Sequence, residues 1–203
     1  MLQIKSKYKI AKRLGAGVFE QTQSQKFALS EARSSKKRER RGGRGGSDFG
    51  RQLLEKQRVR YTYGLSEKQL SNYAQQAIGQ KDPSGELHRS LEMRADSVFY
   101  RAGFAPTRRA ARQALSHGNV KINGVRTTRP SHRLKKGDKI EIRDGARTSP
   151  LYAGLAEKED KRPVPAWLSA DVNLLTIEVT GEPQYNVIDA GLDYSTVFEF
   201  YSR

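Results

Sequence analysis

The hydrophobic pattern changes its period within one stretch, "FAPTRRAARQALSHGNVKINGVRTTRPSHRLKKGDKIEI", at residues 104–142. Apolar residues recur at helical spacing before Gly118 and at spacing two after it. A two-residue Asn123-Gly124 loop favours a type I′ hairpin. The turn "KKGD" then leads into a further strand around Ile140. We therefore predict a short helix followed by a small antiparallel sheet, within an α+β protein.

The predicted helix has two unlike faces. Thr107 can cap its start, and Gly118 can end it. At about 100° per residue, one arc is apolar, and it contains Ala110, Ala111, Ala114 and Leu115. The other arc is expected to face outward, and it contains Arg108, Arg109, Arg112, Gln113 and Ser116.

Arg108 and Arg109 occupy the first turn of this helix, where the helix dipole favours anions. A phosphate group would remove that penalty, because free N–H groups and arginines would both point at it. In the alternative interpretation the arginines only solvate an exposed face. We favour the phosphate, and expect Arg108→Ala or Arg112→Ala to weaken binding of the phosphate-bearing partner by ~1–3 kcal/mol.

The hairpin carries a second unfavourable pair. Its two-residue loop places Lys121 opposite Arg126 on the outer face, and pairs Ile122 with Val125 on the inner face. Like charges directly opposite each other destabilise a hairpin unless an anion bridges them. Three lysines extend this cationic region: Lys135, Lys136 and Lys139.

A net charge of +16 indicates a polyanionic partner. Positive charge is concentrated in the first two-thirds of the chain, and residues 144–203 are acidic overall. This asymmetry favours a binding face over general solubility. The acid-free start of the chain is rich in lysine and poor in serine. We interpret it as a basic RNA-contacting arm rather than a mitochondrial transit peptide.

Several classes of function are disfavoured. The chain has no cysteine, so neither disulfides nor thiolate metal sites are expected, and three histidines make a poor zinc set. No apolar run approaches the ~18 residues of a membrane span, and there is no secretory signal. We predict no cofactor and no metal.

Two helical segments precede the change of period. "SDFGRQLLEKQRVRYTYG" has a helical pattern, and "LSEKQL" starts another helix with Ser66 as N-cap and Gln69 completing a capping box. A further helical stripe runs from Leu87 to Ala102. Near the C-terminus, "LLTIEV" and "TVFEFY" have the pattern of strands, although strand and helix are hard to separate at that length.

The stretch "RADSVFYRAGFAPTRRAARQALSHGNVKINGVRTTRPSHRLKKGDKIEI" resembles the RNA-binding module named after small-subunit ribosomal protein four. That resemblance implies two packed helices and a small sheet. The module is also attached to pseudouridine synthases, tyrosyl-tRNA synthetases and a small heat-shock RNA binder. Two rivals therefore stay open: an RNA-modifying enzyme, for which no second large domain remains, and a stress RNA chaperone for stalled ribosomal particles.

The flanking stretches "SDFGRQLLEKQRVRYTYGLSEKQLSNYAQQA", "LSADVN" and "VFEFYSR" resemble the bacterial-type small-subunit ribosomal protein four, and "KYKIAKRLG" agrees with it. The resemblance implies a primary binder of 16S-type rRNA without catalytic activity. Such a protein docks at a helix junction of the 5′ domain, nucleates assembly of the subunit body and affects decoding accuracy where mRNA enters. The implied neighbours are mRNA and the third and fifth small-subunit proteins, and in some bacteria the protein represses its own mRNA.

The resemblance also implies RNA-facing residues in the module: Arg94, Arg101, Thr107, Arg108, Arg109, Arg112, Gln113, His117, Asn119, Lys121 and Asn123. For His117, a local contact at the helix end is an equal alternative. From charge and position we add further RNA-binding candidates: Lys7, Lys9, Arg13, Lys56, Arg58, Arg60 and Arg126.

The chain departs from the family in two places. Many relatives bind zinc through N-terminal cysteines, so this chain belongs to a cysteine-free branch whose N-terminal region is expected to be ordered by RNA or not at all. "GGRGGSDFG" also departs from the usual run before the "SD" motif, so the contacts of that segment do not carry over.

The predicted organisation has five parts. A flexible basic arm (residues 1–45) precedes a helical domain (46–90), and the RNA-binding module (91–152) is followed by an irregular connector (153–165). The C-terminal segment (166–203) is expected to complete the helical domain. The expected location is the cytoplasm, on ribosomes, and an organellar ribosome stays open.

Overall fold

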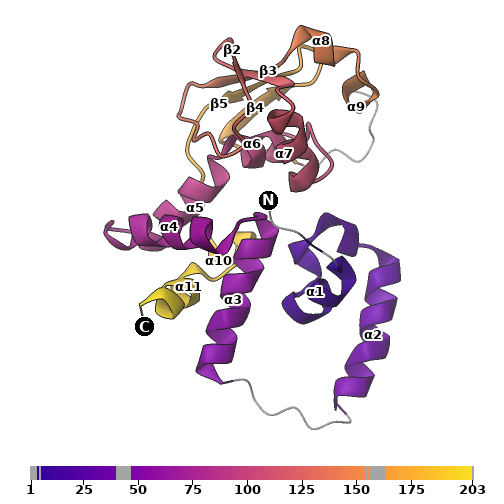
Figure 1. The fold of residues 1–203 in the computed structure, drawn as a ribbon, viewed down its shortest axis with the longest axis vertical. Coiled ribbons are helices and arrows are strands. Elements are labelled where there is room, and N and C mark those ends of the chain that lie inside the picture. Colours follow the sequence, from indigo (N-terminus) through magenta and orange to yellow (C-terminus); the bar gives the residue numbers. More distant parts are fainter. Residues whose placement is uncertain (1–3, 5, 40–46, 154, 156–162, 203) are drawn as a thin grey trace. The chain divides into compact units, whose positions relative to one another are not determined.

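The computed structural model describes residues 4, 6–39, 47–153, 155 and 163–202, and it divides into two compact units (Figure 1). The first unit comprises residues 1–87 and 185–203, and the second comprises residues 88–184. The first is helical, and the second combines helices with a five-stranded antiparallel sheet. The α+β class is confirmed.

The first unit begins with α1 (Lys7–Leu14), the 3₁₀ turns η1 (Ala16–Val18) and η2 (Glu20–Thr22), and α2 (Gln25–Glu39). Their buried side chains form a small apolar core: Ala11, Leu14, Val18, Phe19 and Phe27. The expected flexible arm is therefore corrected over its described part. Its core residues are spread over α1, η1, α2 and the residue that follows η1, so no single helical period reveals them. Residues 1–3, 5 and 40–45 of the predicted arm lie outside the described residues.

The rest of the first unit consists of α3 (Asp48–Thr62), α4 (Glu67–Ile78), α10 (Val187–Ala190) and α11 (Tyr194–Tyr201). The predicted capping box of Ser66 and Gln69 is confirmed at the start of α4. The strand predicted for "TVFEFY" is wrong, because this segment is α11. Asp193 caps it by accepting hydrogen bonds from the backbone N–H groups of Ser195 and Thr196.

In the second unit, α6 (Ala95–Arg101) and α7 (Arg108–Ser116) pack against the sheet (Figure 1). The sheet has the order β2-β1-β3-β5-β4 and is antiparallel throughout. Its strands are β1 (Val120–Ile122), β2 (Val125–Thr127), β3 (Lys139–Ile142), β4 (Leu168–Asp171) and β5 (Thr176–Val179). Two short helices, α8 (Asp144–Arg147) and α9 (Pro150–Ala153), follow β3.

Two boundaries differ from the sequence-based expectation. The stripe from Leu87 to Ala102 belongs to two helices, α5 (Pro83–Glu92) and α6, because Arg94 between them has an extended backbone that bridges to Arg133. In addition, β4 and β5 join the sheet of the second unit through β3. Only residues 185–203 of the C-terminal segment therefore complete the helical unit.

Candidate nucleic-acid interface

Helix α7 presents a polar stripe to solvent. Thr107 caps the helix as predicted, since its Oγ1 accepts a hydrogen bond from the backbone N–H of Ala110 at 3.0 Å. The predicted apolar arc is buried except for the half-buried Ala110. Three exposed side chains recur at helical spacing on the outer face: Arg109, Gln113 and Ser116.

The other two arginines of α7 turn inward, which corrects the expectation that the whole arginine arc faces solvent. Arg108 Nη2 donates to Glu92 Oε1 at 3.0 Å, and Arg112 donates from Nε and Nη2 to Asp96 Oδ2 at 2.9 and 2.8 Å. Their side chains are only 12% and 16% exposed. Arg108, in the first turn of α7, is thus paired with a buried carboxylate of α5. This pairing offsets the unfavourable interaction between its positive charge and the helix dipole, and no phosphate is needed for it.

Arg94 and Arg101, which the family resemblance places in the RNA-facing set, meet the same two carboxylates. Arg101 donates from Nε and Nη2 to the two oxygens of Glu92 at 2.8 and 2.9 Å. Arg94 makes the equivalent pair of bonds to Asp96 at 2.9 and 2.7 Å, and it is buried. Burial lowers the pKa of the neighbouring His88, although the negative charge of Glu92 acts in the opposite direction.

The β1–β2 hairpin has the predicted register, with Lys121 opposite Arg126 and Ile122 opposite Val125. Asn123 and Gly124 have φ angles of 50° and 79°, as a type I′ turn requires. The inward packing expected for Val125 is wrong. Its side chain is 71% exposed, because β2 is the edge strand of the sheet.

The two opposed cations of the hairpin find separate partners. Arg126 donates from Nε to the carbonyl of Gly118 at 3.2 Å and from Nη2 to the carbonyl of His117 at 3.5 Å. It therefore lies at the C-terminal end of α7, where a cation is favourable. Lys121 donates to Asp144 Oδ2 at 3.2 Å, and this hydrogen bond lowers the pKa of Asp144. The like-charge pair is thus accommodated within the chain.

Gly118 is favoured where α7 meets the hairpin, because its φ of +67° strains any residue that has a side chain. A Cβ there would lie 2.4 Å from Arg126 Nε and would displace the end of that flexible side chain. The close approach keeps the exposed guanidinium of Arg126 beside the last turn of α7. It also joins the polar stripe of α7 to the hairpin. We call Arg109, Gln113, Ser116, His117 and Arg126, all of which are exposed, the α7–hairpin surface.

The tip of the hairpin is tied to the lysine-rich turn before β3. Asn123 Nδ2 donates to Asp138 Oδ1 at 2.9 Å, and Asn123 Oδ1 accepts from the backbone N–H of Lys139 at 2.9 Å. The lysines that the sequence analysis placed beside the hairpin, Lys135, Lys136 and Lys139, are exposed here. Exposed Arg129 and Arg133 precede them and were missed, although the charge of "TTRPSHR" was a signal for them. Asn119 is half-buried at the start of the hairpin.

The RNA-binding candidates of the first unit fall into two groups: those on α1, and those on α3 that lie beside glutamates. Lys9 and Arg13 on α1 are exposed, and Lys7 Nζ donates to Gln21 Oε1 at 2.5 Å. By contrast, Arg58 pairs with Glu55 at 2.6 Å, and Arg60 lies 3.7 Å from Glu67.

Lys56 is enclosed by the C-terminal helix. Its side chain is 7% exposed, and its Nζ donates to Glu67 Oε1 at 2.7 Å and lies 4.0 Å from the ring centre of Phe200. Tyr201 Oη donates to the same Glu67 oxygen at 2.9 Å. The geometry gives Lys56 a part in packing, and no exposed surface for phosphate.

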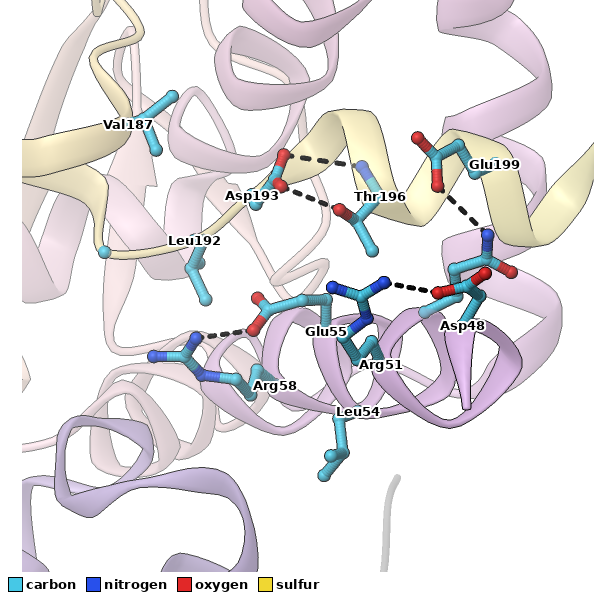
Figure 2. Close-up of a pocket in the computed structure, with 12 residues that line it drawn as sticks. Asp48, Arg51, Leu54, Glu55, Arg58, Val187, Leu192, Asp193, Thr196 and Glu199 are labelled. Atoms are coloured by element: carbon cyan, nitrogen blue, oxygen red, sulfur yellow. Dashed lines mark hydrogen bonds and ion pairs between the residues drawn. The ribbon is translucent and has the colours of Figure 1, made fainter. Parts of the chain in front are cut away.

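A groove of about 830 Å³ lies between α3 and the segment of α10 and α11, within the first unit (Figure 2). Figure 2 shows Arg51 and Glu55 of α3 facing Thr196 and Asp193 across it. Four carboxylates line the groove, namely Asp48, Glu55, Asp193 and Glu199, together with the two arginines Arg51 and Arg58. These arginines are paired with Asp48 and Glu55, so negative charge remains in excess.

Among the described residues, no group of histidine and acidic side chains could hold a metal ion. In the same part of the chain, no helix combines the length and the apolar character that crossing a membrane requires.

Comparison with known proteins divides the chain at nearly the same place as the fold. Residues 3–92 match the family described as the ribosomal protein S4/S9 N-terminal domain, and residues 93–140 match the S4 domain. A small ribosomal subunit protein uS4 of Lachnospira eligens is 40% identical over 172 residues, which cover 84% of this chain and 87% of that protein. The uS4 protein of Borrelia turicatae is 34% identical over 200 residues, covering 98% and 96%. That of Mycobacterium avium is 41% identical over 158 residues, covering 77% and 79%.

Proposed function

Because this chain belongs to the family of the small ribosomal subunit protein uS4, we propose that it is a structural constituent of the small ribosomal subunit and binds rRNA. In the finer proposal it is a primary binder of 16S-type rRNA at a helix junction of the 5′ domain. There it nucleates assembly of the subunit body and contributes to translational accuracy where mRNA enters. The chain is not an enzyme in this proposal, since the relatives reported above, which cover most of it, are small ribosomal subunit proteins.

The observation that carries the RNA-binding proposal is the α7–hairpin surface. It lies entirely within the region that matches the S4 domain, and it places the exposed guanidinium groups of Arg109 and Arg126 beside one helix. Duplex RNA hides its base edges in a deep major groove, so phosphates and 2′-hydroxyls are the groups that a protein can reach. Fixed cations together with neutral donors such as Gln113 suit that target.

The exposed lysines of the turn before β3 and the exposed cations of α1 extend the proposed RNA contacts. Lys56 is left out, because its ammonium group is enclosed by the C-terminal helix. Arg94, Arg101, Arg108 and Arg112 act, in this proposal, mainly through the carboxylates that hold them.

The groove of the first unit supports a protein partner. Four carboxylates line the groove, and only two arginines accompany them. This excess of negative charge favours a segment that carries positive charge. We propose that a basic segment of a neighbouring small-subunit protein, the third or the fifth, occupies it.

The decisive experiment is crosslinking within intact small subunits, mapped to both rRNA and protein. We expect crosslinks from the α7–hairpin surface to the 5′ domain of the rRNA, and from the groove to a basic protein segment. Presence of the protein only in stalled or isolated subunits, and in less than one copy per subunit, would favour an RNA chaperone instead. Absence of rRNA crosslinks from the α7–hairpin surface would overturn the proposed interface.

A further inference from the structure

Two buried carboxylates organise four arginines between α5, α6 and α7. The side chains of Glu92 and Asp96 are 1% and 4% exposed. Glu92 accepts from Arg101 and Arg108, and Asp96 accepts from Arg94 and Arg112. We call these six residues the carboxylate–arginine network. Each carboxylate thus accepts hydrogen bonds from two guanidinium groups.

The network restricts the direction of each guanidinium group. Arg101 grips Glu92 with a two-bond fork, and its side chain is still 37% exposed. Arg108 is held between Glu92 and the ring of Tyr100, whose centre lies 4.7 Å from the guanidinium carbon. Because a planar guanidinium fixed along one edge can turn very little, the partly exposed guanidinium group of Arg101 is held in one orientation.

Stability alone is a poor explanation for this arrangement. Removing ions from water is expensive, and well-packed apolar side chains often stabilise a core as well as a buried ion pair does. The network also lies directly beneath α7, which carries the exposed Arg109 and Gln113. The charges of the network are therefore close to the surface that we propose for RNA binding.

We propose that Glu92 and Asp96 are positioning residues for RNA recognition. They hold their arginines in one charge pattern, so that folded rRNA is preferred over any other polyanion; the proposal rests on the rRNA-binding function proposed above. Mobile cations attract every phosphate backbone. Cations that are already held in place lose less side-chain entropy on binding, but they gain this advantage only with an RNA whose phosphates match their positions. The two carboxylates thus reduce the total positive charge and increase selectivity.

The test compares the full-length protein with Glu92→Gln and Arg101→Lys, measuring affinity for a junction fragment of small-subunit rRNA and for a plain RNA duplex. Glu92→Gln raises the net charge, yet we expect it to bind the junction about tenfold more weakly and the duplex as tightly or more tightly. Arg101→Lys conserves the charge but cannot make the two parallel hydrogen bonds to Glu92, so it should weaken binding to the junction and leave binding to the duplex unchanged. It also keeps the test available if Glu92→Gln does not fold.

The matched control is Glu178→Gln on β5, which removes the charge of an exposed carboxylate from the same unit. It should change both affinities together and only slightly. The positioning role would be overturned if folded Glu92→Gln kept the wild-type preference for the junction over the duplex. It would also be overturned if this variant lost the same amount of affinity for both RNAs. Equal affinities in the wild-type protein would overturn the proposed function itself, so the two failures are distinguishable.

Discussion

Arg109 and Arg112 of α7 differ by three positions, and their neighbours give them different tasks. Arg109 is exposed, whereas Arg112 donates twice to buried Asp96. We expect Arg109→Ala to weaken rRNA binding by about 1–3 kcal/mol with little change in stability. Arg112→Ala should instead lower the free energy of unfolding by about 1–3 kcal/mol, because it removes charge-assisted bonds from a buried carboxylate. Urea denaturation and RNA titration of both variants measure the two effects.

Gln113→Ala is the matched control for Arg109→Ala, since it shortens an exposed neutral side chain on the same stripe. An unchanged affinity of Arg109→Ala would assign that arginine to the solvated surface. An unchanged stability of Arg112→Ala would mean that Arg94 alone satisfies Asp96.

At the scale of single residues, helix caps and the hairpin register were predictable from the sequence. The ion pairs between residues of different helices were not. The cap at Thr107, the capping box at Ser66 and the hairpin register all depend on neighbours a few positions apart, which sequence spacing determines. The arginines of α7 were assigned as one outward arc because helical spacing distinguishes only two faces. Their carboxylates lie on α5 and α6, 16 positions before them, and no local pattern predicts that pairing.

Among the elements, the C-terminal helix α11 shows the same limit. Its segment "TVFEFY" is as compatible with a strand as with a helix, and its contacts with α3 and α4 decide the outcome. The N-terminal helices were missed for a related reason, since their core residues belong to several short elements. By contrast, the strands β1, β2 and β3 were predictable, because the hairpin loop and the alternation of apolar residues agree there.

A carboxylate at the start of α4 gives α11 a pH-dependent attachment. Burial raises the pKa of Glu67, but hydrogen bonds from Lys56 and Tyr201 outweigh it, so that the pKa lies below 4.5. A lowered pKa means that Glu67 stabilises the fold above its unfolded-state value, and that the contribution is lost as the pH falls through the folded-state value. Glu67→Gln should therefore melt below the wild type at pH 7, and the difference should shrink as the pH falls through the lowered pKa of Glu67.

Glu67 also lies in the first turn of α4, where any carboxylate meets a favourable helix dipole. Lys56→Met keeps most of the apolar stem on Phe200 and removes the ammonium group, so a double-mutant cycle isolates the ion pair. Additive effects of the two substitutions would show that the dipole, and not Lys56, accounts for the pH dependence.

At the scale of the whole molecule, the resemblance of separated stretches predicted the family, and the charge asymmetry predicted a polyanionic partner. The division into units was harder to predict. The stretch that contains β4 and β5 is separated from β3 by residues 143–165, and only strand pairing assigns it to the second unit. Sequence composition identifies such a connector but does not reveal which domain continues after it.

The salt dependence of RNA binding tests which of the many cations take part. Each phosphate that a cation neutralises releases counterions, so the logarithm of the binding constant falls linearly with that of the salt concentration. Arg109→Gln and Arg126→Gln should each reduce the magnitude of this slope by about 1, and the double variant by about 2, because both guanidinium groups are exposed. Lys56→Met removes the same charge from an enclosed position and should leave the slope unchanged. If Lys56→Met reduced the slope as much as the arginine variants, binding would depend on net charge alone, and the α7–hairpin surface would lose its special role.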